Sequence, residues 1–230
     1  MEFILMIFII LIMAIASKNV QATFRRFSEV PIRRRITGAQ AARYILDSNG
    51  LQNIPIERIA GALTDHYDSR SKILRLSEPV YNSASISAVG VAAHEAGHAL
   101  QDKSGYFALQ LRQGFYPIAS VGSNLGMGLI FIGLFAATLF QLGATGFTIA
   151  LIGLVLYACA VLFTIITLPV EFNASRRALA CLTEYGIVNE EENAGTRKVL
   201  NAAALTYVAA AVGSILTLLY YAMIIFGNRD

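Results

Sequence analysis

The sequence predicts a mainly α-helical, polytopic membrane protein with about four transmembrane helices and a small β element in its polar part. Two observations support this fold class. Of the 230 residues, 56% are hydrophobic and only 14% are charged, a composition that is unusual for a soluble domain. The apolar residues also gather in runs that contain no Asp, Glu, Lys or Arg, and nearly all charges fall between these runs.

The first apolar run predicts a transmembrane anchor over residues 1–22. It extends from Phe3 to Ala16, and a weakly polar continuation brings it near the roughly 20 residues that cross a hydrocarbon layer. The Ala-Ile-Ala sequence at its end resembles the cleavage site of a signal peptide. However, the run is preceded by Glu2 and by no Lys or Arg, the reverse of a signal peptide's basic start, so we expect an uncleaved anchor.

Three further runs predict the remaining spans. The runs at about residues 118–140 and 147–168 are uncharged throughout and are joined by an uncharged link, so we expect a transmembrane hairpin over residues 118–168. The fourth run, at about residues 202–226, predicts a transmembrane helix and a short tail over residues 202–230.

Basic residues near the ends of the runs predict the orientation of the chain, because Lys and Arg are retained on the cytoplasmic side. They place residues 23–117 and 169–201 in the cytoplasm, and both termini outside. We therefore expect a multi-pass protein of the cell membrane, with the lipid bilayer as a partner. The net charge of +3 follows from this asymmetry and does not indicate a nucleic acid partner. The residues that set the orientation are Lys18, Arg25, Arg26, Arg33, Arg34, Arg35, Arg112, Arg176, Arg177, Arg197 and Lys198, against Arg229 on the other side.

The first polar segment predicts two helices with strands between them. Apolar residues at helical spacing, followed by Asn-Gly, predict a helix over residues 39–48. The stretches 54–68 and 72–81 flank a Ser-Arg-Ser turn and predict strands or a hairpin beside the next helix. That helix begins near residues 83–87, where several serines can cap it, and ends at about Lys103.

This second helix contains the pattern H-E-x-x-H, at His94, Glu95 and His98. Positions four apart lie on one face of a helix, so both imidazoles can bind one metal ion. The pattern is typical of zinc peptidases, in which the metal lowers the pKa of a water to about 7 and the glutamate takes its proton. The alternative is a solvent-facing helix that matches the pattern by chance. Two of the chain's three histidines fall in this motif, after an apolar stretch, and this favours the metal site.

A catalytic zinc requires a third protein ligand and an open position for water. Glu171 is the leading candidate, because it follows Pro169, a residue that often starts helices, and two intervening spans return the chain to the side of His98. The alternative is that Glu171 only complements the dipole of that helix. The other candidates on the same side are Asp65, His66, Glu78, Asp102 and Glu184.

Segments along most of the chain resemble the YugP-like membrane zinc metallopeptidases, whose site is similar to that of the HtpX-type and CAAX prenyl peptidases. The segments are LTDHYD, LRLSEPVYNS, GVAAHEAGHALQ, LPVEFNASRRAL and KVLNAAALTYVAAA. The resemblance implies a cytoplasmic zincin-like metallopeptidase domain with one catalytic Zn²⁺, held by His94, His98 and Glu171, with Glu95 as the base. The chain departs from the HtpX-type pattern E-x-x-x-D because Ser175 stands where the aspartate would be. We expect Ser175 or Asn173 to take a weaker version of its supporting role.

Two features outside the motif are candidates for substrate contacts. His66 or Tyr67 could donate to the substrate carbonyl as an oxyanion stabiliser, although either residue could equally be packed within a strand. The Lys-Ile-Leu-Arg-Leu-Ser strand, residues 72–77, could pair with an extended peptide by strand addition.

These observations predict a membrane-bound, zinc-dependent endopeptidase that hydrolyses peptide bonds of membrane or membrane-proximal proteins at the cytoplasmic face. An intramembrane protease is disfavoured, because the spans contain no Asp or Glu to act as a ligand. The non-enzymatic alternative is a zinc-stabilised membrane scaffold or adaptor. Structural zinc sites are usually closed by four ligands rich in cysteine, and neither Cys159 nor Cys181 lies near the motif.

Overall fold

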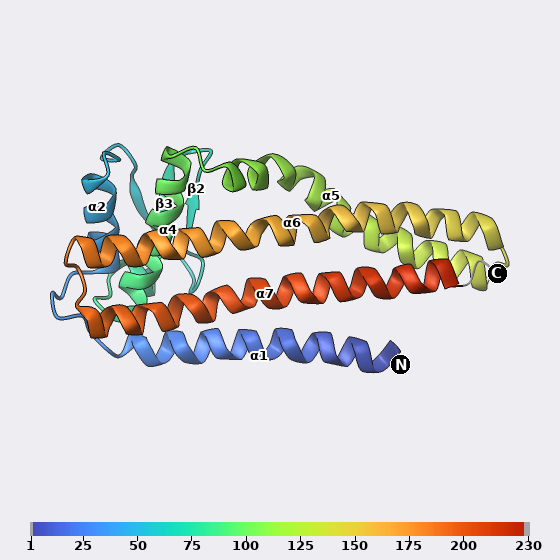
Figure 1. Ribbon diagram of the computed structural model, residues 1–230, viewed down its shortest axis with the longest axis horizontal. Helices are drawn as coiled ribbons and strands as arrows, with labels where there is room; N and C mark the ends of the chain where they lie inside the picture. Colours follow the sequence, from blue (N-terminus) through green and yellow to red (C-terminus); the bar gives the residue numbers. More distant parts are fainter. Residues whose placement is uncertain (1, 228–230) are drawn as a thin grey trace. The chain divides into compact units, whose positions relative to one another are not determined.

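The computed structural model describes residues 2–227; Met1 and residues 228–230 of the predicted C-terminal tail lie outside this range. The chain forms two compact units. The apolar unit contains the residues up to Ile15, Gln110–Leu168 and those from Tyr207 onwards, and the polar unit contains Ala16–Leu109 and Pro169–Thr206. The elements, in chain order, are α1 (Glu2–Ser28), α2 (Gly38–Ser48), β1 (Ile56–Ile59), β2 (His66–Asp68), β3 (Ile73–Ser77), α3 (Glu78–Tyr81), α4 (Ile86–Lys103), α5 (Phe107–Thr138), α6 (Gly143–Glu184) and α7 (Glu190–Gly227) (Figure 1).

Four of these helices, α1, α5, α6 and α7, are long and apolar enough to cross a membrane. Large apolar side chains such as Ile10, Phe131 and Ile132 are exposed on them, as expected where helices face lipid. The predicted fold class, mainly helical with about four transmembrane helices and a small β element, is thereby confirmed.

The helices extend beyond the predicted spans, and α6 continues without a break through Pro169. The prediction that Pro169 starts a helix is therefore wrong, and so is the alternative that Glu171 complements a helix N-terminus there. A proline inside a helix removes one hydrogen bond and crowds the preceding turn, at a cost of about 3 kcal/mol. Val170, directly after it, and Ala174, in the following turn, are fully buried, and this burial offsets the local cost.

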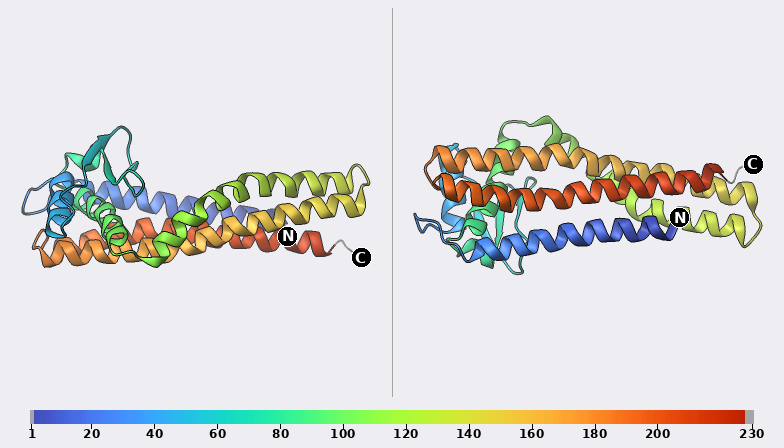
Figure 2. Two further views of the ribbon diagram at one scale, coloured as in Figure 1. Left: turned by 90° about the horizontal axis from the view of Figure 1, so that it is seen from above. Right: turned by 60° about the horizontal axis from the view of Figure 1, so that its bottom comes forward.

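In the apolar unit, α5 and α6 run alongside each other (Figure 2), and their backbones approach closely at glycines. A Cβ atom at Gly133 of α5 would lie 2.3 Å from the backbone nitrogen of Ala150 in α6, and one at Gly126 would lie 2.7 Å from that of Tyr157. Small residues permit this approach, which is how helices commonly associate in a membrane, where no hydrophobic effect drives them together.

In the polar unit, the three strands form one sheet in the order β1-β3-β2, beside α4 (Figure 2). β2 and β3 form an antiparallel hairpin and β1 pairs with β3 in parallel, so the prediction of strands in this region is confirmed. For residues 78–81 it is wrong, because they form the short helix α3, with Pro79 in its first turn, where proline is favoured. The buried side chains of Leu74 and Leu76 share a core with those of α2 and α4. Because β3 is paired on both sides, the expectation that residues 72–77 bind an extended peptide is wrong. Within the described residues the edge strands of the sheet are β1 and β2, and β2 is the edge strand that contacts α4.

The two predicted helices of this unit are confirmed, each with a side-chain cap. The hydroxyl of Thr37 accepts a hydrogen bond from Gln40 N–H, and the Gln40 side chain accepts one from Thr37 N–H, which forms a capping box for α2. Ser85 caps α4 through Ala88 N–H, and α4 ends at Lys103 as predicted. α4 is thereby fixed at its start, two turns before the H-E-x-x-H pattern.

The contact between α5 and α6 predicts different effects on stability for alanine substitutions at two glycines of α5. Gly133→Ala places a methyl group against the backbone of Ala150 and should lower the melting temperature of the detergent-purified protein. Gly128 has no atom within 4 Å of its Cβ position, so Gly128→Ala should be neutral or stabilising by up to about 1 kcal/mol. Equal melting temperatures for the two variants would contradict this account of the contact.

Candidate metal centre

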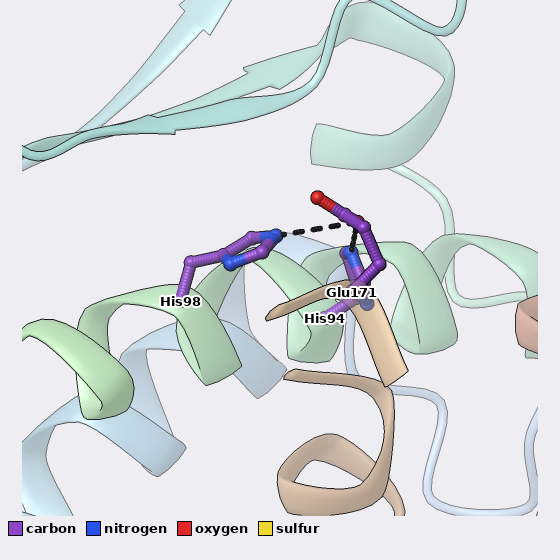
Figure 3. Close-up of side chains that lie close together, drawn as sticks. All are labelled: His94, His98 and Glu171. Carbon is purple, nitrogen blue, oxygen red and sulfur yellow. Dashed lines mark hydrogen bonds and ion pairs between the residues drawn. The ribbon is translucent and has the colours of Figure 1, made fainter. Parts of the chain in front are cut away.

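The side chains of His94, His98 and Glu171 converge at one point of the polar unit, from α4 and α6 (Figure 3). Glu171 Oε2 lies 3.2 Å from His94 Nε2 and 3.6 Å from His98 Nε2, and all three atoms lie within 4.8 Å of one another. His98 and Glu171 are buried, and His94 is partly buried. The structure thus brings together the three residues that the sequence predicts as metal ligands.

A glycine permits α4 and α6 to meet at this point. A Cβ atom at Gly97 would lie 2.5 Å from the carbonyl oxygen of Ala174, well inside van der Waals contact. Glycine in a helix interior is unfavourable by about 1 kcal/mol relative to alanine, and the close approach of α6 is the reason for it here. The same approach brings Glu171, one turn before Ala174, to the imidazoles.

The buried side chain of Gln101 fixes the tautomer of His98. Its Nε2 donates to the carbonyl oxygen of Val170 (2.7 Å) and to Asn173 Oδ1 (3.1 Å), so its Oε1 faces His98 Nδ1 at 3.0 Å. An amide oxygen only accepts, and His98 Nδ1 must therefore carry the proton. The lone pair of His98 Nε2 is left facing Glu171, as metal binding requires.

Ser175 holds His94 in a similar way. Its hydroxyl lies 3.1 Å from His94 Nδ1, and a proton on that nitrogen leaves the lone pair of Nε2 free to face Glu171. Ser175 occupies the position where the HtpX-type pattern has aspartate, and it does contact a histidine of the group. A neutral hydroxyl orients the ring but polarises it less than a carboxylate does.

The donor set fits a zinc ion. The two imidazole nitrogens and the carboxylate oxygen all present lone pairs to one another, an arrangement that a shared cation stabilises. A tetrahedral zinc ion with bonds of about 2.0–2.1 Å holds its ligand atoms about 3.4 Å apart, close to the separations of Glu171 Oε2 from the two nitrogens. Burial alone raises the pKa of Glu171, but the neighbouring His94 and His98 outweigh the effect of burial and hold that pKa below its ordinary range. Glu171 therefore remains a carboxylate, the form that binds a cation.

Glu95 lies beside this group without belonging to it. The backbone N–H of Tyr67, at the free edge of β2, donates to Glu95 Oε2 at 3.0 Å. Among the hydrogen bonds of residues 2–227, none involves Glu95 Oε1. The pKa of the Glu95 carboxyl is raised to about 7, chiefly by burial. The charge of His94 and the Tyr67 N–H lower this pKa, and the charges of Glu171 and Asp65 contribute to raising it. A carboxyl with such a pKa can both accept and release a proton near neutral pH.

The structure does not bring His66 to the group. Its side chain is exposed, and Nδ1 lies 2.8 Å from the carbonyl oxygen of Thr64. It alternates along β2 with Tyr67, whose hydroxyl donates to Asp102 Oδ2 at 2.7 Å, so the two side chains point to opposite faces of the sheet. An oxyanion role for His66 stays a prediction.

The remaining candidates for the third ligand have other partners or lie elsewhere. Asp65 accepts hydrogen bonds from the backbone and hydroxyl of Ser77, Glu78 pairs with Arg58, and Glu184 is exposed at the end of α6. Gln101 is the residue that sequence reasoning missed. Its signal is its position one turn after His98, on the face of α4 that carries both histidines.

The hydrogen bonds of Gln101 predict an effect on metal affinity. Gln101→Leu keeps the approximate size of the side chain but leaves His98 Nδ1–H without an acceptor, so the ring should lose its fixed orientation. Loss of such a supporting contact typically lowers metal affinity about 10–100-fold, which competition with a fluorescent zinc chelator measures. Gln110→Leu, at an exposed position of α5, is the control and should leave the affinity unchanged. Parental affinity in Gln101→Leu would show that the amide does not orient His98.

Comparison with known proteins agrees with this geometry. The family described as "Putative neutral zinc metallopeptidase" matches residues 2–226. The chain is 45% identical over 215 residues to "Putative membrane protease YugP" of Bacillus subtilis (strain 168), which covers 94% of this chain and 92% of that protein. No solved structure matches the chain. A match over nearly its whole length, together with a relative that shares almost half of the aligned residues, shows that the chain belongs to the neutral zinc metallopeptidase family.

Proposed function

We propose that this chain is a membrane-bound, zinc-dependent endopeptidase. The observation that carries the proposal is the convergence of His94, His98 and Glu171 next to the buried Glu95, which keeps one carboxylate oxygen free of hydrogen bonds among the described residues. Zinc held by the three side chains would supply Lewis acidity, which polarises a peptide carbonyl and makes a water a better nucleophile.

Glu95 moves the proton in this proposal. Oε2 is held by Tyr67 N–H, so Oε1 accepts a proton from the attacking water while the oxygen of that water bonds to the carbonyl carbon. Glu95 then gives the proton to the amide nitrogen as the carbon–nitrogen bond breaks. The products are a carboxylic acid and an amine, and Glu95 returns to its starting state. The acid then passes its proton to the amine, which leaves a carboxylate and an ammonium ion.

The free edge of β2 offers a place for an extended substrate. β2 is at the edge of the sheet, and the N–H of Tyr67 points away from β3 towards Glu95. Because the Tyr67 N–H is held by Glu95, a peptide that runs along this edge would be aligned beside Glu95 by its extended backbone, with little demand on its side chains. This supports unfolded or flexible polypeptide segments as substrates.

A catalytic site is better supported than a structural one. Zinc sites that only stabilise a fold are usually closed by four protein ligands. Here three ligand side chains converge within the described part of the chain. The nearby Glu95 does not complete a set of four, because its Oε2 accepts a hydrogen bond from Tyr67 N–H of β2. The buried Glu95 carboxyl has a pKa raised to about 7, and such perturbed groups are typical of catalytic sites and not of structural ones.

The orientation of the chain in the membrane determines which proteins can reach the site. The distribution of Lys and Arg supports a cytoplasmic location for residues 23–117 and 169–201, with residues 1–22, 118–168 and 202–230 as the membrane-spanning parts. Glu171 follows the last residue of the third apolar run, Leu168, by three positions, so the site lies near the membrane surface in this proposal. Membrane proteins and membrane-proximal polypeptides are therefore the expected substrates.

Replacement of the base separates metal binding from hydrolysis. Glu95→Gln is nearly isosteric and keeps an acceptor for Tyr67 N–H, but its amide cannot take a proton, so zinc content should persist while hydrolysis falls by about 10²–10⁴-fold. Cleavage of an unfolded membrane protein by purified enzyme, with zinc measured on the same sample, tests this. Undiminished hydrolysis by zinc-loaded Glu95→Gln would refute the role of Glu95.

Replacement of Glu171 tests the ligand set. Glu171→Ala leaves two imidazoles, too few to retain the ion, so bound zinc should be lost on dialysis together with activity. Glu184→Ala, which removes an exposed carboxylate from the end of the same helix, should change neither. If Glu171→Ala retains full zinc stoichiometry, Glu171 is not the third ligand.

The orientation is tested with single cysteines in a chain whose Cys159 and Cys181 are replaced by alanine. A cysteine at Glu191 should resist a membrane-impermeant thiol reagent in intact cells, and one at Ala144, at the tip of the hairpin, should react. Both positions are exposed, so accessibility of the side chain itself does not limit the reaction. Labelling in the opposite sense would exclude cytoplasmic proteins as substrates.

A further inference from the structure

A groove between the polar parts of α6 and α7 is not used by the proposed chemistry. In the polar unit these helices run side by side (Figure 1 and Figure 2). The groove has a volume of about 510 Å³, within the range of about 300–1,000 Å³ that is typical of small-molecule sites. Its floor and walls include Phe172, Leu179 and Ala204, which are apolar, and Thr183, Asn193 and Asn201, which offer neutral hydrogen-bonding groups.

The charge of the groove is entirely positive. Arg176 of α6 and Arg197 of α7 both line it, and none of its lining residues is acidic. Both side chains are exposed, and among residues 2–227 neither guanidinium forms an ion pair or a hydrogen bond. Arg75, Arg43 and Arg58 in the same unit are each paired with a carboxylate. Two unpaired guanidinium groups over one groove favour a doubly contacted anion, and the planar fork of arginine suits phosphate oxygens in particular.

The groove lies close to the apolar runs in the sequence. Arg197 precedes Ala202, the start of the fourth run, by five residues, or about 7.5 Å of helix, and Arg176 follows Leu168 by eight residues, or about 12 Å. The headgroup layer of a bilayer is about 5–8 Å thick on each side, and a long arginine side chain extends over the difference. The anion available at this depth is the phosphate of a lipid headgroup, and the apolar wall formed by Phe172 suits the start of an acyl chain.

We propose that the groove between α6 and α7 binds the phosphate-bearing headgroup of an anionic phospholipid through Arg176 and Arg197. The lipid is anchored next to the metal group, because Ser175, which contacts His94 Nδ1, also lines the groove. This inference does not depend on peptidase activity and extends the role of the site to recognition of the surrounding membrane.

Native mass spectrometry of the purified full-length protein tests the site, with phosphatidylglycerol or phosphatidylcholine added to the detergent. The parent should retain phosphatidylglycerol in preference to phosphatidylcholine. The double variant Arg176→Gln/Arg197→Gln should bind phosphatidylglycerol at least about tenfold more weakly, because it loses charge-assisted hydrogen bonds to the phosphate. The matched control is Arg25→Gln/Arg26→Gln, which removes the same charge from exposed positions in the last turn of α1 and should retain the lipid.

Three results would overturn the proposal. Equal retention of the two lipids by the parent excludes an anion site, and this measurement requires no variant. Equal losses in the two double variants would show that overall charge, not the groove, attracts the lipid. Displacement of phosphatidylglycerol by inorganic phosphate at comparable concentration would assign the groove to free phosphate instead.

Discussion

The close approach of α4 and α6 at Gly97 is the constraint on which the rest of the site depends. With no side chain at Gly97, the backbone of α6 comes near enough for Gln101 to bond to the carbonyl oxygen of Val170 and for Glu171 to face both imidazoles. The contact is made by backbone atoms, which cannot move aside as a flexible side chain can. Any larger residue at Gly97 would separate the two helices and, with them, the ligands.

A second contact positions Glu95 independently of α6. β2 has only three residues, and its place beside α4 is fixed by the Tyr67 hydroxyl, which donates to Asp102, and by Lys72, which also pairs with Asp102. Asp102 lies about two turns after Glu95 on α4, and Glu95 accepts the hydrogen bond from Tyr67 N–H. α4 therefore binds Tyr67 twice, through Asp102 to its hydroxyl and through Glu95 to its backbone N–H. The buried Glu95 carboxyl is thus oriented by a backbone group and not by a mobile side chain.

The sequence predicts those features that local periodicity or composition determines. The spacing of His94 and His98 on one helix face, the apolar runs and the helix at residues 39–48 are of this kind. The number of spans between His98 and Glu171 predicts that both lie on one side of the membrane, and this points to Glu171 without any contribution from Pro169. The expectation that Pro169 starts a helix is wrong because the penalty of a helical proline is local, whereas the burial that offsets it comes from distant residues. The central place of β3 depends on contacts between separate segments, and no local pattern carries that information. The position of Gln101 on the histidine face of α4 can be read from the sequence, but its hydrogen bonds to Val170 and Asn173 of α6 cannot.

The ligands of the candidate metal group are divided between two segments that are far apart in the chain. His94 and Glu171 are separated by 77 positions, and both apolar runs of the α5–α6 hairpin lie between them. During synthesis, a ribosome that has just completed α4 has released a chain with the two histidines and Glu95 but without the carboxylate of α6. The nascent protein cannot assemble the whole group until the hairpin has been made, so any activity of the group is withheld until membrane insertion is well advanced.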